Sequence, residues 1–234
     1  MGFFRWSFLL LVGIPYYLLW PGAVLPVLEK SVPGCIWRGD ARTNAIALTF
    51  DDGPDPVYTP QVLDTLDRWN IKATFFLVGE RARLYPGLVQ QIRKRGHEAA
   101  NHTDSWDRTI GAGVDRFEQD LLEAHKTLAL DSGPKYFRPA GGMLRPSHLK
   151  ILKKHGYSCV LASALPFDPY RPPAGWIKAL VNRSLRPGAI VVLHDSGGDR
   201  SRTVAALPGI IEEAHERGLA IVRLSELLDP TSRY

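Results

Sequence analysis

The sequence lacks the features that mark fibrous, disulfide-rich and nucleic-acid-binding proteins. It contains no low-complexity tract and no internal repeat, and its 234 residues include only two cysteines, too few for a disulfide scaffold. These two, Cys35 and Cys159, allow one bridge if the domain is exported, but Cys159 lies in a strand-like run and a plain buried thiol is the more ordinary expectation. The net charge of +5 is small and the basic residues are scattered, so we expect no nucleic-acid partner. What remains is typical of one globular domain, with or without an appendage.

Charge is absent from one long stretch, residues 6–28. It is long enough to cross a bilayer, since a membrane helix needs about 20 residues, and it has the Trp and Tyr side chains common at membrane interfaces. A signal-anchor, a cleaved signal peptide and a soluble core helix are the three interpretations, and the best cleavage motif, at residues 21–23, is a poor one. We expect residues 1–30 to be a signal-anchor or signal peptide. The membrane is then a partner through residues 6–28, and the domain is membrane-anchored or secreted, outside the cytosol.

Beyond a linker expected at 31–44, strands and helices alternate. Thr59 and Pro60 are expected to open the first helix, with Thr59 as its cap. The apolar patterns predict strands at 45–48, 73–79, 98–100, 136–138, 157–162, 189–193 and 219–222, and helices at 59–69, 84–95, 115–130, 146–155, 175–185 and 203–217. About seven such units favour an α/β fold in which a parallel sheet closes, or nearly closes, into a barrel. The domain is expected over 45–228, with a tail at 229–234.

Polar residues follow four of the predicted strands. Adjacent carboxylates, Asp51 and Asp52, come first, and the other three stretches are 101–103 (Asn-His-Thr), 137–142 (Phe-Arg-Pro-Ala-Gly-Gly) and 193–195 (Leu-His-Asp). Each alone is weak, because an Asp-Gly turn, a structural histidine, a surface ion pair or a glycine turn explains it. In a parallel barrel, however, the carboxyl ends of the strands meet at one face, where active sites are built. The four stretches together therefore predict an active site.

This pattern resembles the polysaccharide deacetylases, the NodB-type domain of carbohydrate esterase family four, over roughly residues 45–228. The motifs Thr-Phe-Asp-Asp-Gly-Pro at 49–54, Asn-His-Thr, Phe-Arg-Pro and Leu-His-Asp match in order and spacing. The resemblance implies an irregular (β/α) barrel of about seven strands. It also implies removal of N- or O-acetyl groups from chitin, peptidoglycan and related glycans with a divalent metal, often zinc.

The resemblance also implies a role for each matching residue. Asp51 is the expected general base, Arg138 its ionic partner, and His194 the general acid that protonates the leaving amine. The backbone N–H of Gly141 is expected to face the developing oxyanion. Asp52 and His102 are the expected metal ligands, a hard oxygen and an imidazole.

The sequence departs from the family pattern at the second histidine ligand. Trp106 stands in that position, and an indole offers only an N–H donor, so it cannot ligate a metal. Asp107 is the expected substitute, with Asp104 behind it. A carboxylate in place of imidazole makes the ligand set harder and tilts preference from zinc towards manganese or magnesium. Downstream, Asp168 could lie near His194 and raise its pKa, or could simply be a turn residue.

Three function classes follow from these residues. The favoured one is a metal-dependent deacetylase of an N-acetylated amino-sugar polysaccharide, chitin-like or peptidoglycan-like. The second is a glycan-binding pseudoenzyme that has lost its metal site at Trp106, and the third is another amide hydrolase on the same scaffold. Retention of Asp51, Arg138 and His194 favours the first, because a binder needs neither base nor acid.

Overall fold

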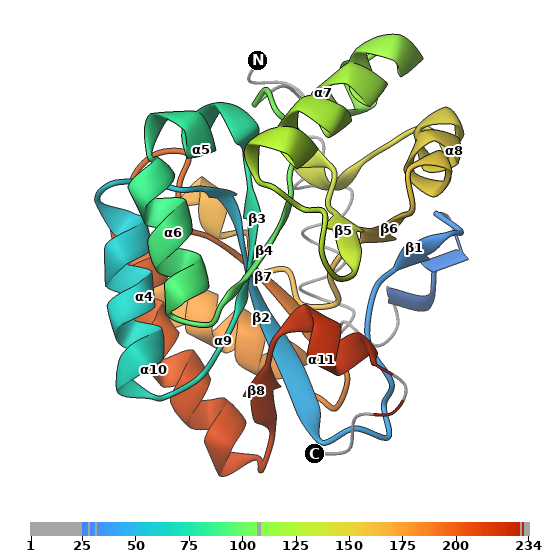
Figure 1. Cartoon of the computed structure of the whole chain (residues 1–234). Coiled ribbons are helices and arrows are strands. Elements are labelled where there is room, and N and C mark those ends of the chain that lie inside the picture. Colours follow the sequence, from blue (N-terminus) through green and yellow to red (C-terminus); the bar gives the residue numbers. More distant parts are fainter. Residues whose placement is uncertain (1–24, 28, 31, 107–108, 230, 232–234) are drawn as a thin grey trace.

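The computed structural model describes residues 25–27, 29–30, 32–106, 109–229 and 231, and its named strands form one parallel sheet (Figure 1). The order across the sheet is β1-β6-β5-β4-β3-β2-β7, and β8 pairs with the start of β2. The strands are β1 (Cys35–Ile36), β2 (Ala45–Gly53), β3 (Thr74–Leu77), β4 (Glu98–Asn101), β5 (Lys135–Phe137), β6 (Tyr157–Val160), β7 (Ile190–His194) and β8 (Ala220–Val222). The predicted α/β fold of parallel strands is confirmed.

The sheet curls into an incomplete barrel. Just beyond β6, the N–H groups of Ser163 and Ala164 donate to Ile190 O at 3.0 and 3.1 Å, and Val192 N–H donates to Ala164 O at 3.1 Å. The segment that follows β6 thus meets the edge strand β7 through an isolated bridge between Ala164 and Val191, not through a full ladder. This half-open closure agrees with the irregular barrel expected from the sequence.

Helices wrap the outside of the sheet (Figure 1). They contact one another in the order α9, α10, α4, α6, α5, α7 and α8. Their bounds are α4 (Tyr58–Arg68), α5 (Gly79–Leu84), α6 (Pro86–Lys94), α7 (Val114–Thr127), α8 (Pro146–Lys154), α9 (Ala174–Ser184) and α10 (Ser201–Glu216); α11 (Leu224–Leu228) follows β8. Three 3-10 turns, η2 (Thr109–Gly111), η3 (Ala140–Gly142) and η4 (Asp168–Tyr170), lie in the loops. Each predicted helix is present within a few residues of its expected bounds.

Strand β2 is buried on both faces and its side chains alternate between two cores. Ile46, Leu48 and Phe50 join the apolar cluster that packs against helices α4 and α10. Ala45 and Ala47 face the other way, into a cluster built mainly from strand residues inside the barrel. Because side chains in a strand alternate, Thr49 and Asp51 continue this inward row towards the carboxyl end.

The N-terminal part differs from the expected linker. Residues 35–36 form β1 and pair with β6, and Leu25 is buried in a cluster with Phe117 and Phe137. The expected membrane segment falls on residues 6–28, of which 6–24 and 28 lie outside the described residues. Within the described part of the chain, no helix has the length and apolar character needed to cross a bilayer.

Helix α4 begins differently from the prediction. It starts at Tyr58, so Thr59 lies inside the helix and is not its cap. The carboxylate of Asp55 accepts hydrogen bonds from the N–H groups of Val57 and Tyr58 at 2.9 and 3.1 Å and takes over that role. Thr59 instead donates to Asp195 at 2.5 Å, a partner 136 residues further along.

Candidate active site

The two adjacent carboxylates reach one site because β2 is irregular at its end. Asp51 follows the inward alternation of the strand and is 4 % exposed. Asp52 would point outward in a regular strand, but its φ of 72° is left-handed and the pairing with β3 shifts register between Asp51 and Gly53. Such a bulge re-aims a side chain, so that Asp52 contacts His102 and not the helical layer.

Asp51 is held by a buried arginine. Arg138 Nη1 lies 2.7 Å from Asp51 Oδ1 and also donates to Thr49 Oγ1 at 2.7 Å. The rest of the guanidinium donates to the carbonyl oxygens of Val160 and Leu161 at 3.2 and 3.1 Å. Every nitrogen of this cation is thereby bonded to a fixed acceptor, so the Asp51–Arg138 pair expected from the sequence is present and its orientation is fixed.

His194 lies beside Asp51 on the neighbouring strand, in direct register with it. Its Nδ1 lies 2.9 Å from Asp168 Oδ1, and its backbone N–H donates to Asp168 Oδ2, also at 2.9 Å. Burial alone would lower the pKa of His194, but the charge and hydrogen bond of Asp168, together with the charges of Asp52 and Asp51, outweigh burial, so the pKa is raised to about 9. The ring is therefore protonated at neutral pH, and Nε2 is the nitrogen left for a substrate.

Asp52 and His102 form a half-site for a cation. His102 Nδ1 lies 2.8 Å from Arg138 O, so it carries the ring proton and donates it there. The other nitrogen, Nε2, lies 3.3 Å from Asp52 Oδ1. Two acceptor atoms then face each other, an arrangement that either a second ring proton, on Nε2, or a metal ion satisfies. Metal-binding histidines usually donate their other ring N–H to a carbonyl or carboxylate, as His102 does to Arg138 O. Burial would raise the pKa of Asp52, but His102 and His194 lower it to about 2, so it is ionised.

Trp106 fills the position of the expected second histidine. Its indole N–H contributes to lowering the pKa of Asp52, its ring edge lies against Gly197, and Arg81 sits 5.7 Å from its ring centroid. The ring is 48 % exposed at the mouth of the site. The described residues thus offer a metal ion two ligands, Asp52 and His102. The third ligand position holds Trp106, whose indole cannot bind a metal.

Neither of the two expected substitute ligands, Asp107 and Asp104, completes the metal site among the described residues. Asp104 was the second-choice ligand, and this expectation is wrong: Arg83 takes both of its oxygens, at 2.6 and 2.8 Å. Asp107, the first choice, lies outside the described residues, and its role stays a prediction. Across the part of the chain that the structure describes, no group of three or more His, Cys, Asp or Glu side chains is arranged to hold a metal.

Gly141 lies in the loop after β5, in the left-handed region with a φ of 76°, and is exposed. The N–H groups on either side are engaged, that of Ala140 by Thr109 Oγ1 at 2.9 Å and that of Gly142 by Pro139 O at 2.9 Å. The expected oxyanion role of the Gly141 N–H stays a prediction.

Several supporting residues escaped the sequence analysis. Thr49 orients Arg138, Thr203 donates to Asp168 at 2.9 Å, and Asp195 is buried behind the site against Thr59. Burial raises the pKa of Asp195 to about 7. Thr49 and Asp195 carried a signal, since both belong to the motifs at 49–54 and 193–195, whereas Thr203 acts from an ordinary helix position.

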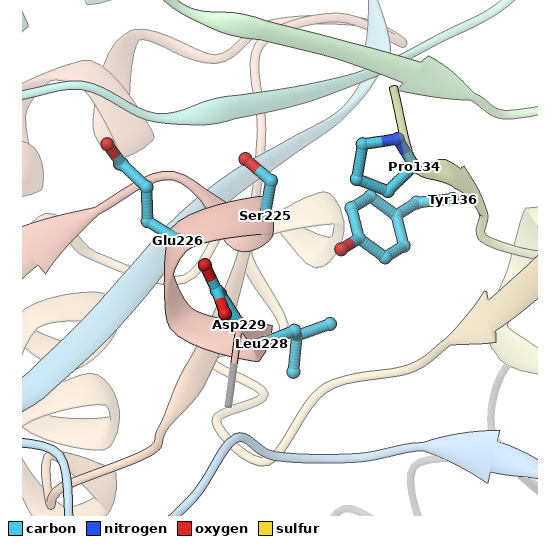
Figure 2. A pocket seen from close by; sticks show the side chains of 6 residues that line it. All are labelled: Pro134, Tyr136, Ser225, Glu226, Leu228 and Asp229. Atoms are coloured by element: carbon cyan, nitrogen blue, oxygen red, sulfur yellow. The ribbon is translucent and has the colours of Figure 1, made fainter. Parts of the chain in front are cut away.

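A separate hollow of about 430 Å³ lies at the opposite ends of the strands. Figure 2 shows that it lies between α11 and the start of β5, with Tyr136 facing Ser225 and Leu228. Burial raises the pKa of Tyr136 to about 12, so its hydroxyl stays protonated. None of the residues predicted for catalysis lines this hollow.

Comparison with known proteins matches residues 38–160 to the polysaccharide deacetylase family model. A peptidoglycan-N-acetylglucosamine deacetylase of Bacillus cereus is 40% identical over 200 residues, which cover 82% of this chain and 92% of that protein. A chitooligosaccharide deacetylase of Sinorhizobium fredii is 34% identical over 210 residues, covering 84% and 96%.

Solved structures of three kinds resemble this fold. The Bc1960 peptidoglycan N-acetylglucosamine deacetylase superposes with a TM-score of 0.80 at 28% identity, covering 94% of this chain and 98% of that one. A mutant of BA3943, a CE4 family pseudoenzyme, with restored enzymatic activity gives 0.79 at 28% identity, covering 88% and 75%. A family 4 acetyl xylan esterase from Clostridium thermocellum in complex with cobalt gives 0.71 at 32% identity, covering 78% and 89%. The chain therefore belongs to the polysaccharide deacetylase family and is a hydrolase of that family.

Proposed function

We propose that this protein removes the acetyl group from an N-acetylated amino-sugar polysaccharide of the chitin or peptidoglycan type. The observation that supports this most directly is the pairing at the ends of two neighbouring strands, Asp51 with Arg138 and His194 with Asp168. A base and an acid held side by side are what hydrolysis of an amide requires. The curated relatives that act on peptidoglycan and chitooligosaccharides supply the substrate class.

Asp51 is the proposed base. One of its oxygens is engaged by Arg138, and the contact keeps the carboxylate in place while the other oxygen accepts a proton from the attacking water. Because Arg138 is 3 % exposed and bonded on all sides, it stays where it is when the charge on Asp51 changes.

His194 is the proposed acid. Water adds to the acetyl carbonyl, the C–N bond breaks, and the amine leaves with a proton from His194 Nε2. The pKa of about 9 keeps this proton available at neutral pH, and the bond from Nδ1 to Asp168 aims the ring. The Gly141 N–H is the proposed donor to the carbonyl oxygen as negative charge develops on it.

We also propose a divalent cation held by Asp52 and His102, zinc by family resemblance, with manganese or magnesium as alternatives. When bound, such an ion acts as a Lewis acid and makes water more acidic. Support comes from the two facing acceptors at 3.3 Å and from the cobalt complex of a family 4 esterase. The presence of Trp106 in the third ligand position argues against a full set of three protein ligands.

The test is acetate release from acetylated chito-oligosaccharides and from peptidoglycan. An O-acetylated xylan is assayed beside them, to compare hydrolysis of an ester with hydrolysis of an amide. Asp51→Asn keeps an oxygen for Arg138 but removes the base, and we expect turnover to fall by roughly 10²–10⁴-fold with the fold intact. Asp64→Asn on α4, whose side chain is 64% exposed, is the matched control and should leave turnover unchanged. Unchanged acetate release by Asp51→Asn removes Asp51 from the mechanism.

A second candidate, a glycan-binding protein without turnover, rests on Trp106 in the ligand position and on the pseudoenzyme among the structural neighbours. It predicts binding of the same oligosaccharides with no acetate release by the parent protein at any metal concentration. Finally, we propose that the domain works outside the cytosol, held at the membrane by residues 6–28, because that run is uncharged and long enough to cross a bilayer.

A further inference from the structure

The two cysteines, 124 residues apart in the chain, meet at the edge of the sheet. Cys35 in β1 and Cys159 in β6 are direct partners in the parallel pairing, and their sulfur atoms lie 2.8 Å apart. Neighbouring strands are about 4.7–4.9 Å apart, which is inside the range of Cα separations, about 4.4–6.8 Å, that a disulfide spans. The spacing of the two paired strands is therefore compatible with a disulfide, and the two sulfur atoms already face each other.

The surroundings suit a bridge that forms after folding. Cys159 is 2% exposed, while Cys35 is only partly buried. A hollow of about 300 Å³, lined by Gly34, Tyr157 and Cys159 among others, opens beside the pair and gives a small reagent access. The hydrogen bond to the Cys159 thiol lowers the pKa of Cys35, whereas the same bond and burial raise the pKa of Cys159. Cys35 is therefore the thiol that ionises first.

We propose that Cys35 and Cys159 form an intrachain disulfide that fastens β1 to the edge of the sheet. The oxidant is itself a disulfide, either a small molecule or a thiol–disulfide oxidoreductase. The Cys35 thiolate attacks one of its sulfurs, forms a mixed disulfide and expels one thiolate. Cys159, losing its proton, then attacks the Cys35 sulfur and expels the second. Two thiols of the protein are oxidised, one disulfide is reduced to two thiols, and the S–S bond joins β1 to β6.

The bridge lies next to the scaffold of the active site. The residues directly after Cys159 are Val160 and Leu161, whose carbonyl oxygens hold the guanidinium of Arg138. β6 is bordered on its outer side by the two-residue strand β1, so the bridge secures the less supported edge of this strand. It also closes a loop that contains most of the domain, and a long loop is where a crosslink restricts the unfolded chain most.

The experiment compares full-length protein equilibrated with oxidised glutathione and with excess dithiothreitol. Each sample is denatured, alkylated and weighed as the intact chain. We expect no alkylated cysteine after oxidation and two after reduction, and a monomer on a non-reducing gel. The oxidised form should melt about 5–15 °C above the reduced form. The two oxidants are distinguished by repeating the reaction with an oxidoreductase at catalytic concentration.

Cys35→Ser is the safer variant, because its side chain is only partly buried, and its melting temperature should not respond to oxidation. Cys159→Ser should behave in the same way, and Cys35→Ser supplies the answer if Cys159→Ser does not fold. The proposal is overturned if protein that was folded during the oxidation still carries two alkylated cysteines. Stable glutathione adducts on both thiols, or a disulfide-linked dimer, overturn it as well. The outcome does not depend on deacetylase activity.

Discussion

Replacing Asp168 by Asn tests whether the acid function of His194 is set by its partner. The Asn side chain keeps an oxygen to accept from Nδ1 while the negative charge is lost. Its NH2 group replaces the oxygen that accepts from the His194 backbone N–H and from Thr203, so those two hydrogen bonds are lost as well. In the wild type the carboxylate raises the pKa of His194 to about 9, against a burial effect that lowers it. Without that charge burial is opposed only by the more distant Asp51 and Asp52, so the pKa should fall to the ordinary value of about 6.5 or lower.

The size of the effect follows from these two values. A fall of about 2.5 pKa units corresponds to about 3 kcal/mol of interaction with the charged ring. At pH 8 a group of pKa about 9 is about 90 % protonated, and one of pKa about 6.5 is about 3 % protonated. The variant should therefore lose about 30-fold in kcat/KM at pH 8 and little at pH 5.5, where both forms are protonated.

The assay is the pH profile of kcat/KM for acetate release from a chito-oligosaccharide, under the same metal conditions for both proteins. The alkaline limb should move from about 9 towards neutral pH. Asp199→Asn is the control, because this exposed carboxylate follows the same strand but bonds to Tyr58 and Ser201, not to His194. An unmoved alkaline limb, or a loss of the same factor at every pH, refutes the assignment of Asp168 as the group that keeps His194 protonated.

Further predictions concern the metal site and the N-terminus. Trp106→His should raise affinity for zinc at least tenfold by supplying the third ligand, whereas Trp106→Phe, which keeps an aromatic ring but supplies no ligand atom, should not; equal zinc affinity in all three proteins would count against the half-site. Asp107→Ala should weaken metal binding if this carboxylate completes the site, and parent-like binding excludes it. Full-length protein should stay with membranes after carbonate extraction, while a chain starting at Cys35 should be soluble; release of the intact full-length chain would disprove the anchor.

The sequence was most informative where local rules decide the structure. Helices such as α8 and α10 follow from apolar spacing and from terminal glycines, and the end of β2 follows from an apolar run that stops at Gly53 and Pro54. These features depend on a few neighbouring residues, so a single sequence contains them. The Asp51–Arg138 contact joins residues 87 positions apart, and it was expected from the resemblance to the polysaccharide deacetylases.

Features that depend on distant partners were not predictable. Thr59 looked like a helix cap but serves Asp195, and Asp104 looked like a metal ligand but is held by Arg83. Residues 35–36 looked like linker because their partner, β6, comes more than a hundred residues later. In each case the neighbouring residues in the sequence suggest one role, whereas the fold brings in a partner from elsewhere in the chain and gives the residue a different one.

Strand β2, which carries the proposed base, is bordered by β3, β7 and β8, whereas β5, which ends next to Arg138, has only three residues. The two members of the pair thus belong to parts of the fold with different resistance to local opening. Separating β2 from its neighbours means dismantling the central core, so Asp51 should leave its place only when the whole domain unfolds. The arginine side has less of its own strand to hold it and relies on its buried acceptors. Partial unfolding of this protein would therefore begin by moving the Arg138 guanidinium away and would leave the Asp51 carboxylate in position.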